Sequence, residues 1–326
     1  MRAAFYTRQG PAHEVLRIGE LPTPRPGPGE VRVRLRASGV NPSDWKTRRG
    51  GFGRGLIAPL IIPHSDGAGE IDAIGEGIPD RVGERVWLWN GQWKRPNGTA
   101  AQYIVLPSAQ AVHLPDRVDY AAGACLGIPA LTAIQAVRLA QIGLGTNVLV
   151  AGGAGSVGHY TIQLAKLRGA RVLTTISSNA KAAYARAAGA DEPINYRTEN
   201  VGERVRGLTH GQGVDALIEM DLCGNAILYP AILRPHARIA MYGTSTGDAT
   251  LPALWLMQNS VALLPFLIYE VSPADRAAGL AELSSLLQSG ALIHTVARRL
   301  PLEAIAEAHD LVEQGAVMGN VVIDIP

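Results

Sequence analysis

The stretch NVLVAGGAGSVG, Asn147 to Gly158, decides the fold. A short apolar strand is predicted to run directly into Gly153-x-Gly155-x-x-Gly158, and the helix-forming stretch YTIQLAKLRG follows. Strand, glycine turn and helix in this order are typical of a dinucleotide-binding unit. We expect Gly153 to take the positive φ of a tight turn, Gly155 to let the backbone approach a diphosphate, and Gly158 to let the helix pack close to the strand.

The start of the predicted helix supplies the anion contact. Backbone N–H groups of Ser156 and Val157 would face the diphosphate. The positive end of the helix dipole favours the same negative charge. Glycines that merely form a turn are the simpler interpretation, but the surrounding pattern favours dinucleotide binding.

That surrounding pattern begins after Leu114-Pro115, where Ala-rich helical segments alternate with short apolar strands. Such alternation predicts an α/β domain with a parallel doubly wound sheet. Helices are expected over Ser156–Arg168 and Ala180–Ala188. Strands are expected at Asn147–Ala151, Arg171–Ile176, Pro193–Tyr196, Ala216–Met220 and Arg238–Tyr242.

The first third of the chain has a different pattern, rich in Pro and Gly. Glu30 to Ala37, EVRVRLRA, alternates apolar and basic residues as a half-buried antiparallel strand does. From about Ser260 the pattern is mixed again, so we expect the tail to return to the first domain. The predicted domains are 1–118 with 260–326, and 119–259.

Composition bounds the class of protein. The 326 residues suffice for two domains, and 47% hydrophobic with 18% charged residues is ordinary for a globular protein. A net charge of +2 argues against a nucleic-acid partner. Cys125 and Cys223 form no C-x-x-C motif, and the longest apolar run, Val261 to Tyr269, is too short to cross a membrane. We expect a soluble, cytoplasmic protein.

The end of the second predicted strand indicates which coenzyme binds. An acidic residue about 20 positions after the glycines would accept hydrogen bonds from the ribose of NAD. Here the strand ends in Ile176-Ser177-Ser178-Asn179, and Lys181 follows. Hydroxyl groups and a cation suit a 2′-phosphate, so NADPH is predicted over NADH. Taken alone, Lys181 is better explained as an exposed helix charge.

Further motifs extend the pattern over nearly the whole chain. They are ASGVNPSD at Ala37 to Asp44, PHSDGAGEI at Pro63 to Ile71, GERVW at Gly83 to Trp87, GTAAQYIVLP at Gly98 to Pro107 and AAGACLGIPALTA at Ala121 to Ala133. In this order, together with the glycine turn, the chain resembles the zinc-independent quinone oxidoreductase (zeta-crystallin-like) branch of the medium-chain dehydrogenase/reductase superfamily. The resemblance implies a GroES-like β-rich domain plus a Rossmann domain, with the active site in the cleft.

The resemblance also carries site residues over. It implies that Asn41 and Asp44, in the N-P-x-D motif, lie beside the nicotinamide as the catalytic pair. Asp44 is equally well interpreted as a helix cap. The resemblance implies cofactor contacts at Thr132, Lys181, Tyr196, Tyr242, Gly243, Thr244 and Asn320. Asn320 lies in the segment Met318-Gly319-Asn320, where this chain lacks the Lys or Arg that many relatives place by the 2′-phosphate.

No metal site is expected. The positions of the zinc ligands in related enzymes read Asn41, Ser65 and Ile128 here, which is no zinc ligand set. His64 lies one residue away, but a lone histidine is more often a hydrogen-bonded structural residue. A zinc alcohol dehydrogenase with unusual ligands, including His64, stays open as an alternative.

Without zinc, alcohol oxidation loses its main source of alkoxide stabilisation, and reduction of an activated double bond remains. The predicted substrate is a small planar quinone or enone, with Asn41 orienting the nicotinamide or the substrate carbonyl. A non-catalytic NADPH-binding sensor or structural protein is the other alternative. A homodimer is expected from the family and from the apolar stretch Ala262 to Ile268.

Overall fold

The computed structural model describes residues 1–51 and 55–326. They form two compact units, residues 1–128 with 284–326 and residues 129–283. These limits differ from the predicted boundaries at 118/119 and 259/260. The second difference has a structural cause, because β13 (Ala262–Pro265) pairs in parallel with β12 (Leu233–Met241) and so completes the sheet of the second unit.

The second unit contains a six-stranded sheet in the order β10-β9-β8-β11-β12-β13. Every neighbouring pair is parallel, and Leu149 of β8 lies between Leu173 of β9 and Leu217 of β11. From β8 the strands are added outward first as β9 and β10, and then on the other side as β11, β12 and β13. This order is that of the Rossmann fold, so the predicted doubly wound sheet is confirmed. The remaining strands are β8 (Asn147–Val150), β9 (Arg171–Ile176), β10 (Glu192–Asn195) and β11 (Val214–Glu219).

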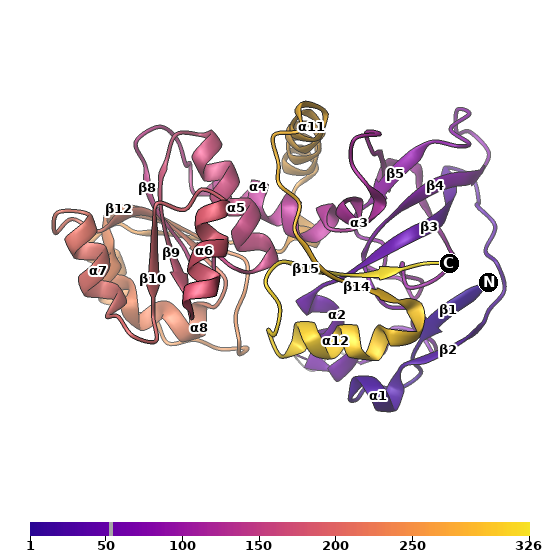
Figure 1. Ribbon diagram of the computed structural model, residues 1–326, viewed down its shortest axis with the longest axis horizontal. Coiled ribbons are helices and arrows are strands. Elements are labelled where there is room, and N and C mark those ends of the chain that lie inside the picture. Colours follow the sequence, from indigo (N-terminus) through magenta and orange to yellow (C-terminus); the bar gives the residue numbers. More distant parts are fainter. Residues whose placement is uncertain (52–54) are drawn as a thin grey trace. The chain divides into compact units, whose positions relative to one another are not determined.

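Helices flank both faces of this sheet (Figure 1). Strands that are covered on both faces are mostly apolar, and Ala216, Leu217 and Ile218 in the middle of β11 are all buried. The helices of this unit are α4 (Leu131–Leu139), α5 (Ser156–Leu167), α6 (Asn179–Ala187), α7 (Val201–Leu208), α8 (Leu222–Asn225), η4 (Ala226–Leu228), α9 (Tyr229–Ile232), α10 (Ala253–Gln258) and η5 (Ile268–Glu270), while η3 (Leu126–Ala130) and α11 (Pro273–Ser289) span its two limits.

The first unit is built on a seven-stranded mixed sheet, β14-β15-β3-β4-β5-β7, in which β6 also pairs with β3. A two-stranded sheet of β1 and β2 is separate. Both ends of the chain lie in this unit. Its strands are β1 (Arg2–Phe5), β2 (Arg17–Glu20), β3 (Glu30–Val40), β4 (Asp66–Ile74), β5 (Arg85–Leu88), β6 (Tyr103–Pro107), β7 (Ala111–His113), β14 (Val296–Pro301) and β15 (Asn320–Asp324).

Strand β3 shows why the alternating stretch forms half-buried structure. Val31, Val33 and Leu35 are fully buried on one side. On the other side the guanidinium of Arg32 donates two hydrogen bonds of 2.9 Å to the carboxylate of Asp72 on β4. The neighbours β4, β6 and β15 all run antiparallel to β3, as predicted.

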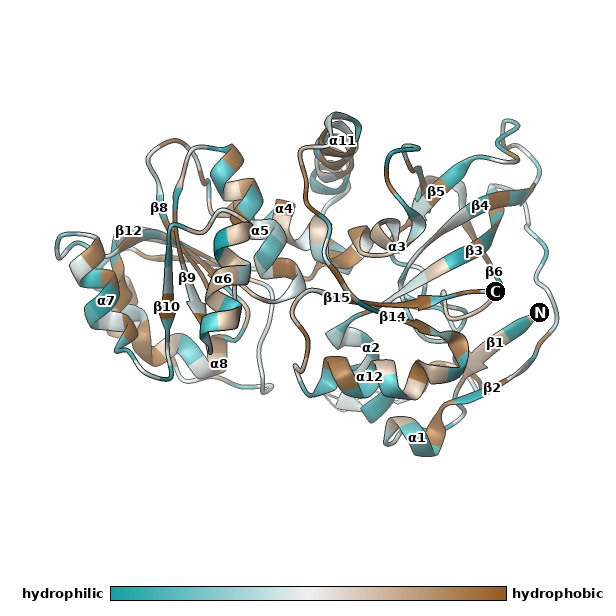
Figure 2. Cartoon of the chain, in the orientation of Figure 1, coloured by the Kyte–Doolittle hydropathy of each residue, from teal (hydrophilic) through white to brown (hydrophobic). Residues whose placement is uncertain are grey.

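Helix α12 (Ile305–Glu313) packs against the core of this unit through Ile305 and Ala308. Figure 2 shows hydrophobic and hydrophilic residues side by side along it, and Ile305, Ala308 and His309 are its buried residues. The other helices of the unit are α1 (Ala12–Val15), α2 (Pro42–Arg49), η2 (Ser108–Gln110), α3 (Tyr120–Gly123) and η6 (Leu302–Ala304). Among the described residues, no helix combines the length and apolarity that crossing a bilayer requires.

Candidate functional site

The glycine turn joins β8 to α5 as predicted, but with one correction. The positive φ belongs to Gly152, at +69°, and not to Gly153. The Gly152 N–H donates to Thr175 Oγ1 at 3.0 Å. Gly153 is needed for packing instead, because a Cβ there would lie 2.1 Å from Thr174 Oγ1 and 2.9 Å from Ile162 Cδ1. The turn thus lies directly against β9.

The other two glycines differ in what requires them. A Cβ at Gly158 would lie 2.4 Å from the carbonyl oxygen of Gly152, so α5 packs against the turn only with glycine there. Gly155 is exposed, has an ordinary φ of −80°, and its Cβ would meet only Gly152 O at 3.4 Å. Neither conformation nor internal packing therefore requires glycine at 155. A ligand that approaches the backbone would require it.

The N-terminus of α5 suits an anion. Gly155 is its N-cap and provides no capping side chain, and no acidic residue lies in the first turn. The helix dipole adds partial positive charge at Ser156 and Val157, the first two helical residues. Diphosphate groups of dinucleotides bind at helix ends of this kind.

Three predicted phosphate contacts follow β9. Ser178 is the N-cap of α6, and its Oγ accepts a hydrogen bond of 3.3 Å from the N–H of Lys181. Ser177 and Lys181 are half-buried. In the part of the chain that the structure describes, no carboxylate forms an ion pair with the Lys181 ammonium. Ser178 therefore has a structural role, whereas no ion pair of this kind accounts for Lys181.

The ends of β10 and β12 carry the next predicted residues. Tyr196 directly follows β10 and is 54% exposed, which is unusual for a tyrosine that serves only packing. After β12, burial and the neighbouring Glu219 raise the pKa of Tyr242. A Cβ at Gly243 would lie 2.2 Å from Met220 O, and Thr244 Oγ1 donates to Thr246 O at 2.9 Å. These loops lie at the carboxyl edge of the sheet, where Rossmann domains bind ligands.

The sequence reasoning missed Glu219, the last residue of β11. Its buried carboxylate accepts hydrogen bonds from the N–H of Asp221 at 2.7 Å, from Asn225 Nδ2 at 2.8 Å and from the hydroxyl of Tyr229 at 3.1 Å. Burial raises the pKa of this carboxyl group. Glu219 thus fixes the loop at the point where the strand order reverses. An acid at the end of an apolar strand is the signal that could have identified it.

Thr132 lies in the first turn of α4 and is 3% exposed. Its Oγ1 has no hydrogen-bond partner among residues 1–51 and 55–326. A buried hydroxyl without a partner is unfavourable by about 1–3 kcal/mol, so it indicates a ligand contact. This observation agrees with the cofactor contact predicted for Thr132, and the residues of this unit fit a nicotinamide dinucleotide.

The predicted catalytic pair lies in the first unit, at the start of α2. Asn41 is the N-cap, Pro42 is the first helical residue, and the Asp44 carboxylate accepts a hydrogen bond of 2.7 Å from the Asn41 N–H. Asp44 therefore closes a capping box, the structural alternative considered for it. Burial raises the pKa of Asp44 to about 7.

Asp66, the first residue of β4, is a second residue that the sequence reasoning missed. It is fully buried, and its Oδ2 accepts hydrogen bonds from Asn41 Nδ2 and from the N–H of Ile128, each at 3.0 Å. One carboxylate thereby connects two of the positions that hold zinc in related enzymes. It accepts the Asn41 amide and leaves the second hydrogen of Nδ2 as a donor.

The donors at these positions do not fit a zinc ion. Asn41, Ser65 and Ile128 supply neither thiolate nor imidazole, and no group of three metal-ligating residues exists within the described ranges. Both ring nitrogens of His64 are engaged, Nδ1 with Ser38 Oγ at 2.8 Å and Nε2 with His309 Nε2 at 3.0 Å. These contacts agree with the structural role expected for His64.

Asn320 begins β15 in the first unit. It is 5% exposed, and its Nδ2 donates to Thr295 O at 2.9 Å. This hydrogen bond already explains the buried amide without a cofactor.

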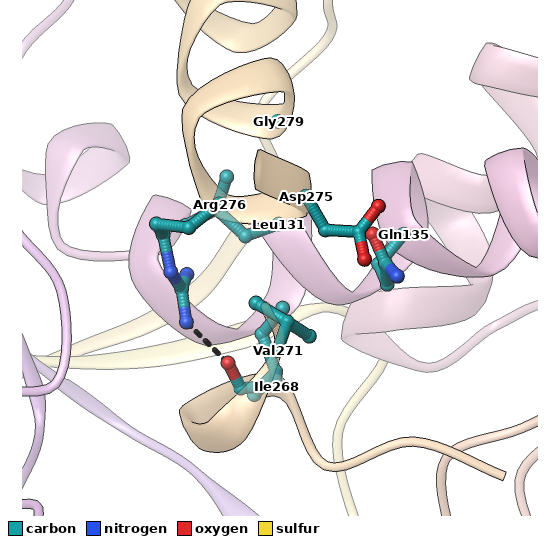
Figure 3. Close-up of a pocket in the computed structure, with 7 residues that line it drawn as sticks. All are labelled: Leu131, Gln135, Ile268, Val271, Asp275, Arg276 and Gly279. Atoms are coloured by element: carbon teal, nitrogen blue, oxygen red, sulfur yellow. Dashed lines mark hydrogen bonds between the residues drawn. The ribbon is translucent and has the colours of Figure 1, made fainter. Parts of the chain in front are cut away.

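A small pocket lies elsewhere in the second unit, between α4, η5 and α11 (Figure 3). Figure 3 shows the Arg276 guanidinium donating to the carbonyl of Ile268. Asp275 contacts Ser272 and the guanidinium of Arg138. Because the charged groups of Arg276 and Asp275 are already paired within the protein, they are not left to bind a dinucleotide. The carboxyl edge of the sheet therefore remains the candidate site.

Comparisons with known proteins agree with this geometry. Residues 27–116 match the alcohol dehydrogenase GroES-like domain, and residues 156–285 match the zinc-binding dehydrogenase family. A quinone oxidoreductase of Pseudomonas aeruginosa is 32% identical over 331 residues, covering 99% of this chain and 98% of the relative.

Two solved structures show the same similarity. A mycobacterial protein in complex with NADPH has a TM-score of 0.89 and 29% identity, covering 99% of this chain and all of that one. An NAD-dependent alcohol dehydrogenase has a TM-score of 0.87 and 32% identity over the full length of both chains. The GroES-like and Rossmann prediction is confirmed. The chain belongs to the medium-chain dehydrogenase/reductase superfamily of oxidoreductases, in its quinone oxidoreductase branch.

Proposed function

We propose that this protein is a zinc-independent NADPH-dependent reductase of quinones or other conjugated carbonyl compounds. The glycine turn carries the proposal, because a ligand explains the glycine at position 155 and the fold does not. The buried, unpartnered hydroxyl of Thr132 on α4 supports it. The diphosphate would bind at Ser156 and Val157, and the nicotinamide half would contact Thr132. The similar mycobacterial structure was solved with NADPH.

The preference for NADPH rests on the residues after β9. Ser177 and Lys181 offer a hydroxyl group and a cation, and the segment Ile176–Lys181 contains no carboxylate that would repel a 2′-phosphate. Tyr196 is exposed enough to contact the adenosine end. Loop residues Tyr242, Gly243 and Thr244 would line the coenzyme.

When bound, NADPH supplies a hydride. Reduction of a quinone or enone places negative charge on the substrate oxygen, and that charge is stabilised by a hydrogen-bond donor. We assign this donor to the second N–H of Asn41 Nδ2, which the contact with Asp66 leaves available. Asp44 holds the Asn41 backbone through the capping box. Asn320 we keep as a peripheral contact only.

A panel of substrates tests this function. Purified protein is expected to oxidise NADPH when a benzoquinone or an unsaturated aldehyde is added, and metal analysis is expected to find less than stoichiometric zinc. Binding of NADPH without turnover of any substrate would instead favour a sensor or structural protein.

The similarity to an NAD-dependent alcohol dehydrogenase supports a second candidate, a zinc enzyme with unusual ligands. Its requirement is a set of convergent ligands, and the imidazoles of His64 and His309 are occupied by each other. One zinc ion per chain, together with oxidation of a primary alcohol by NAD, would establish this candidate and exclude our proposal.

We further propose that the protein is a cytoplasmic homodimer. Strand β13 forms one end of the sheet, and Leu254 and Met257 of the preceding α10 are 65% and 75% exposed. A second copy that pairs along β13 would cover this edge. Light scattering is expected to give twice the mass of 34.5 kDa; a mass of one chain would contradict the dimer.

A further inference from the structure

A buried row of polar side chains connects α12 with the start of β4 in the first unit. Arg48 Nε contacts His309 Nδ1 at 3.4 Å, and His309 Nε2 contacts His64 Nε2 at 3.0 Å. His64 Nδ1 contacts Ser38 Oγ at 2.8 Å. Ser38 Oγ contacts Thr99 Oγ1 at 2.8 Å, and Thr99 Oγ1 donates to the main-chain carbonyl of Asp66 at 2.6 Å.

The direction of every hydrogen bond in this row is determined. The Asp66 carbonyl only accepts, so the single hydroxyl hydrogen of Thr99 points to it and Ser38 must donate to Thr99. His64 Nδ1 must then donate to Ser38, and His64 Nε2 must accept from His309.

Starting from the other end gives the same result. The guanidinium of Arg48 only donates, so His309 accepts at Nδ1 and carries its proton on Nε2. Both histidines are therefore neutral with one fixed tautomer each. Arg48 itself is fully buried and is held by Glu313 Oε2 at 2.7 Å.

This hydrogen-bonded row ends at Asp66, whose side chain accepts a hydrogen bond from Asn41. Gly127 packs over the same carboxylate, since a Cβ there would lie 2.4 Å from Asp66 Oδ1. The main chain of Asp66 is fixed by Thr99, and its carboxylate by Asn41 and Ile128. The orientation of the Asn41 amide is thus determined by buried residues of the first unit.

We propose that Asp66 is a positioning residue that sets the orientation of the Asn41 amide. By accepting one hydrogen of Nδ2 it directs the other toward the substrate oxygen. This inference rests on the proposed function for its catalytic consequence, but the contact itself is testable without turnover. Displacement of a catalytic group by about 1 Å typically lowers the rate by about 100-fold, so loss of the Asp66 contact is expected to lower kcat by about 10- to 100-fold.

A double-mutant cycle tests the catalytic consequence. Asp66→Ala is expected to lower kcat for quinone reduction by about 10- to 100-fold, with the KM for NADPH changed less than about twofold, since the proposed contacts to the diphosphate and the 2′-phosphate lie in the second unit. In an Asn41→Ala background, Asp66→Ala is expected to cause no further loss, because it acts through Asn41. Asp72→Ala, on the same strand and paired with Arg32, is the control and is expected to retain the wild-type kcat. Losses that multiply in the double variant would overturn the proposal.

Side-chain amide NMR of the full chain separates this proposal from the function. The Asn41 NH₂ resonances, identified by their loss in Asn41→Ala, are expected to move in Asp66→Ala and to stay in place in Asp72→Ala. Unchanged Asn41 resonances in Asp66→Ala would overturn the proposal whatever the activity. Absence of NADPH turnover in the wild type, with the shift present, would refute only the proposed function.

A second variant covers the case in which Asp66→Ala does not fold. Asn41→Asp puts two carboxyl groups at the same contact of 3.0 Å, where both cannot be ionised. In Asn41→Asp we expect a carboxyl ¹³C resonance that titrates well above the ordinary range of aspartate and is absent from the wild type, where Asp44 near this contact already has a pKa raised to about 7. If Asn41→Asp adds no such resonance, the contact is contradicted.

Discussion

Replacing His64 by asparagine tests how the buried histidine pair responds to acid. His64 is fully buried, and burial lowers its pKa to about 3 from the ordinary 6.5. Burial, and then the neighbouring His64 and Arg48, lower the pKa of His309 as well. At pH 5 neither ring takes up a second proton in the folded state, whereas in the unfolded chain histidine does. The stability contributed by the neutral His64 is therefore fully present above pH 6.5 and is lost as the pH falls toward 3.

The magnitude follows from proton uptake on unfolding. A histidine with an ordinary pKa in the unfolded chain and none of its charge in the fold lowers the free energy of unfolding by about 2 kcal/mol between pH 7 and pH 5. Asparagine cannot take up that proton and tolerates the left-handed backbone of His64, where φ is +76°. The loss of stability between these pH values is thus expected to be smaller by about 2 kcal/mol in His64→Asn than in the wild type.

Urea unfolding followed by tryptophan fluorescence measures this difference. Four of the five tryptophans, Trp45, Trp87, Trp89 and Trp93, lie in the first unit with His64. His210→Asn is the matched control, because His210 is exposed and also has a positive φ, of +53°. It is expected to keep the wild-type pH dependence. If His64→Asn and the wild type lose the same free energy from pH 7 to pH 5, the neutral buried pair is refuted.

Three further predictions concern single residues. Because the pKa of Asp44 is raised to about 7, the folded protein takes up a proton on Asp44 between pH 7 and pH 5 that the unfolded chain does not, which stabilises the wild type by about 2 kcal/mol. Asp44→Asn is expected to lack this gain in urea unfolding; the same pH dependence in variant and wild type would contradict this. Gly153→Ala is expected to lower the urea midpoint, because a Cβ there meets Thr174. Gly155→Ala is expected to keep the wild-type midpoint and to raise the Kd for NADPH at least about tenfold in fluorescence titration. A lower midpoint for Gly155→Ala with an unchanged Kd would contradict the roles assigned to these glycines. Lys181→Ala is expected to raise the Kd for NADPH about tenfold and leave that for NADH unchanged; equal effects would exclude a 2′-phosphate contact.

The elements were predictable from the sequence because their signals are local. The glycine spacing and the alternation of Glu30 to Ala37 each describe one element, and both are confirmed. The assignment of the positive φ to Gly153 was wrong, since two consecutive glycines left the choice open and the packing of Thr174 against the turn decides it.

The candidate site was less accessible because its support is non-local. Asp66 contacts Ile128 across 62 positions, and His64 contacts His309 across 245. No spacing rule connects such residues. Glu219 is a different case, because its three donors lie only 2, 6 and 10 positions further along the chain. Its signal, an acid that ends an apolar strand, was local and was missed.

Titration of the full chain with NADPH and with NADH, followed by coenzyme fluorescence, tests the central claim most directly. We expect one saturable site per chain that binds NADPH more tightly than NADH. Folded protein that takes up neither coenzyme would contradict a dinucleotide site at the turn between β8 and α5.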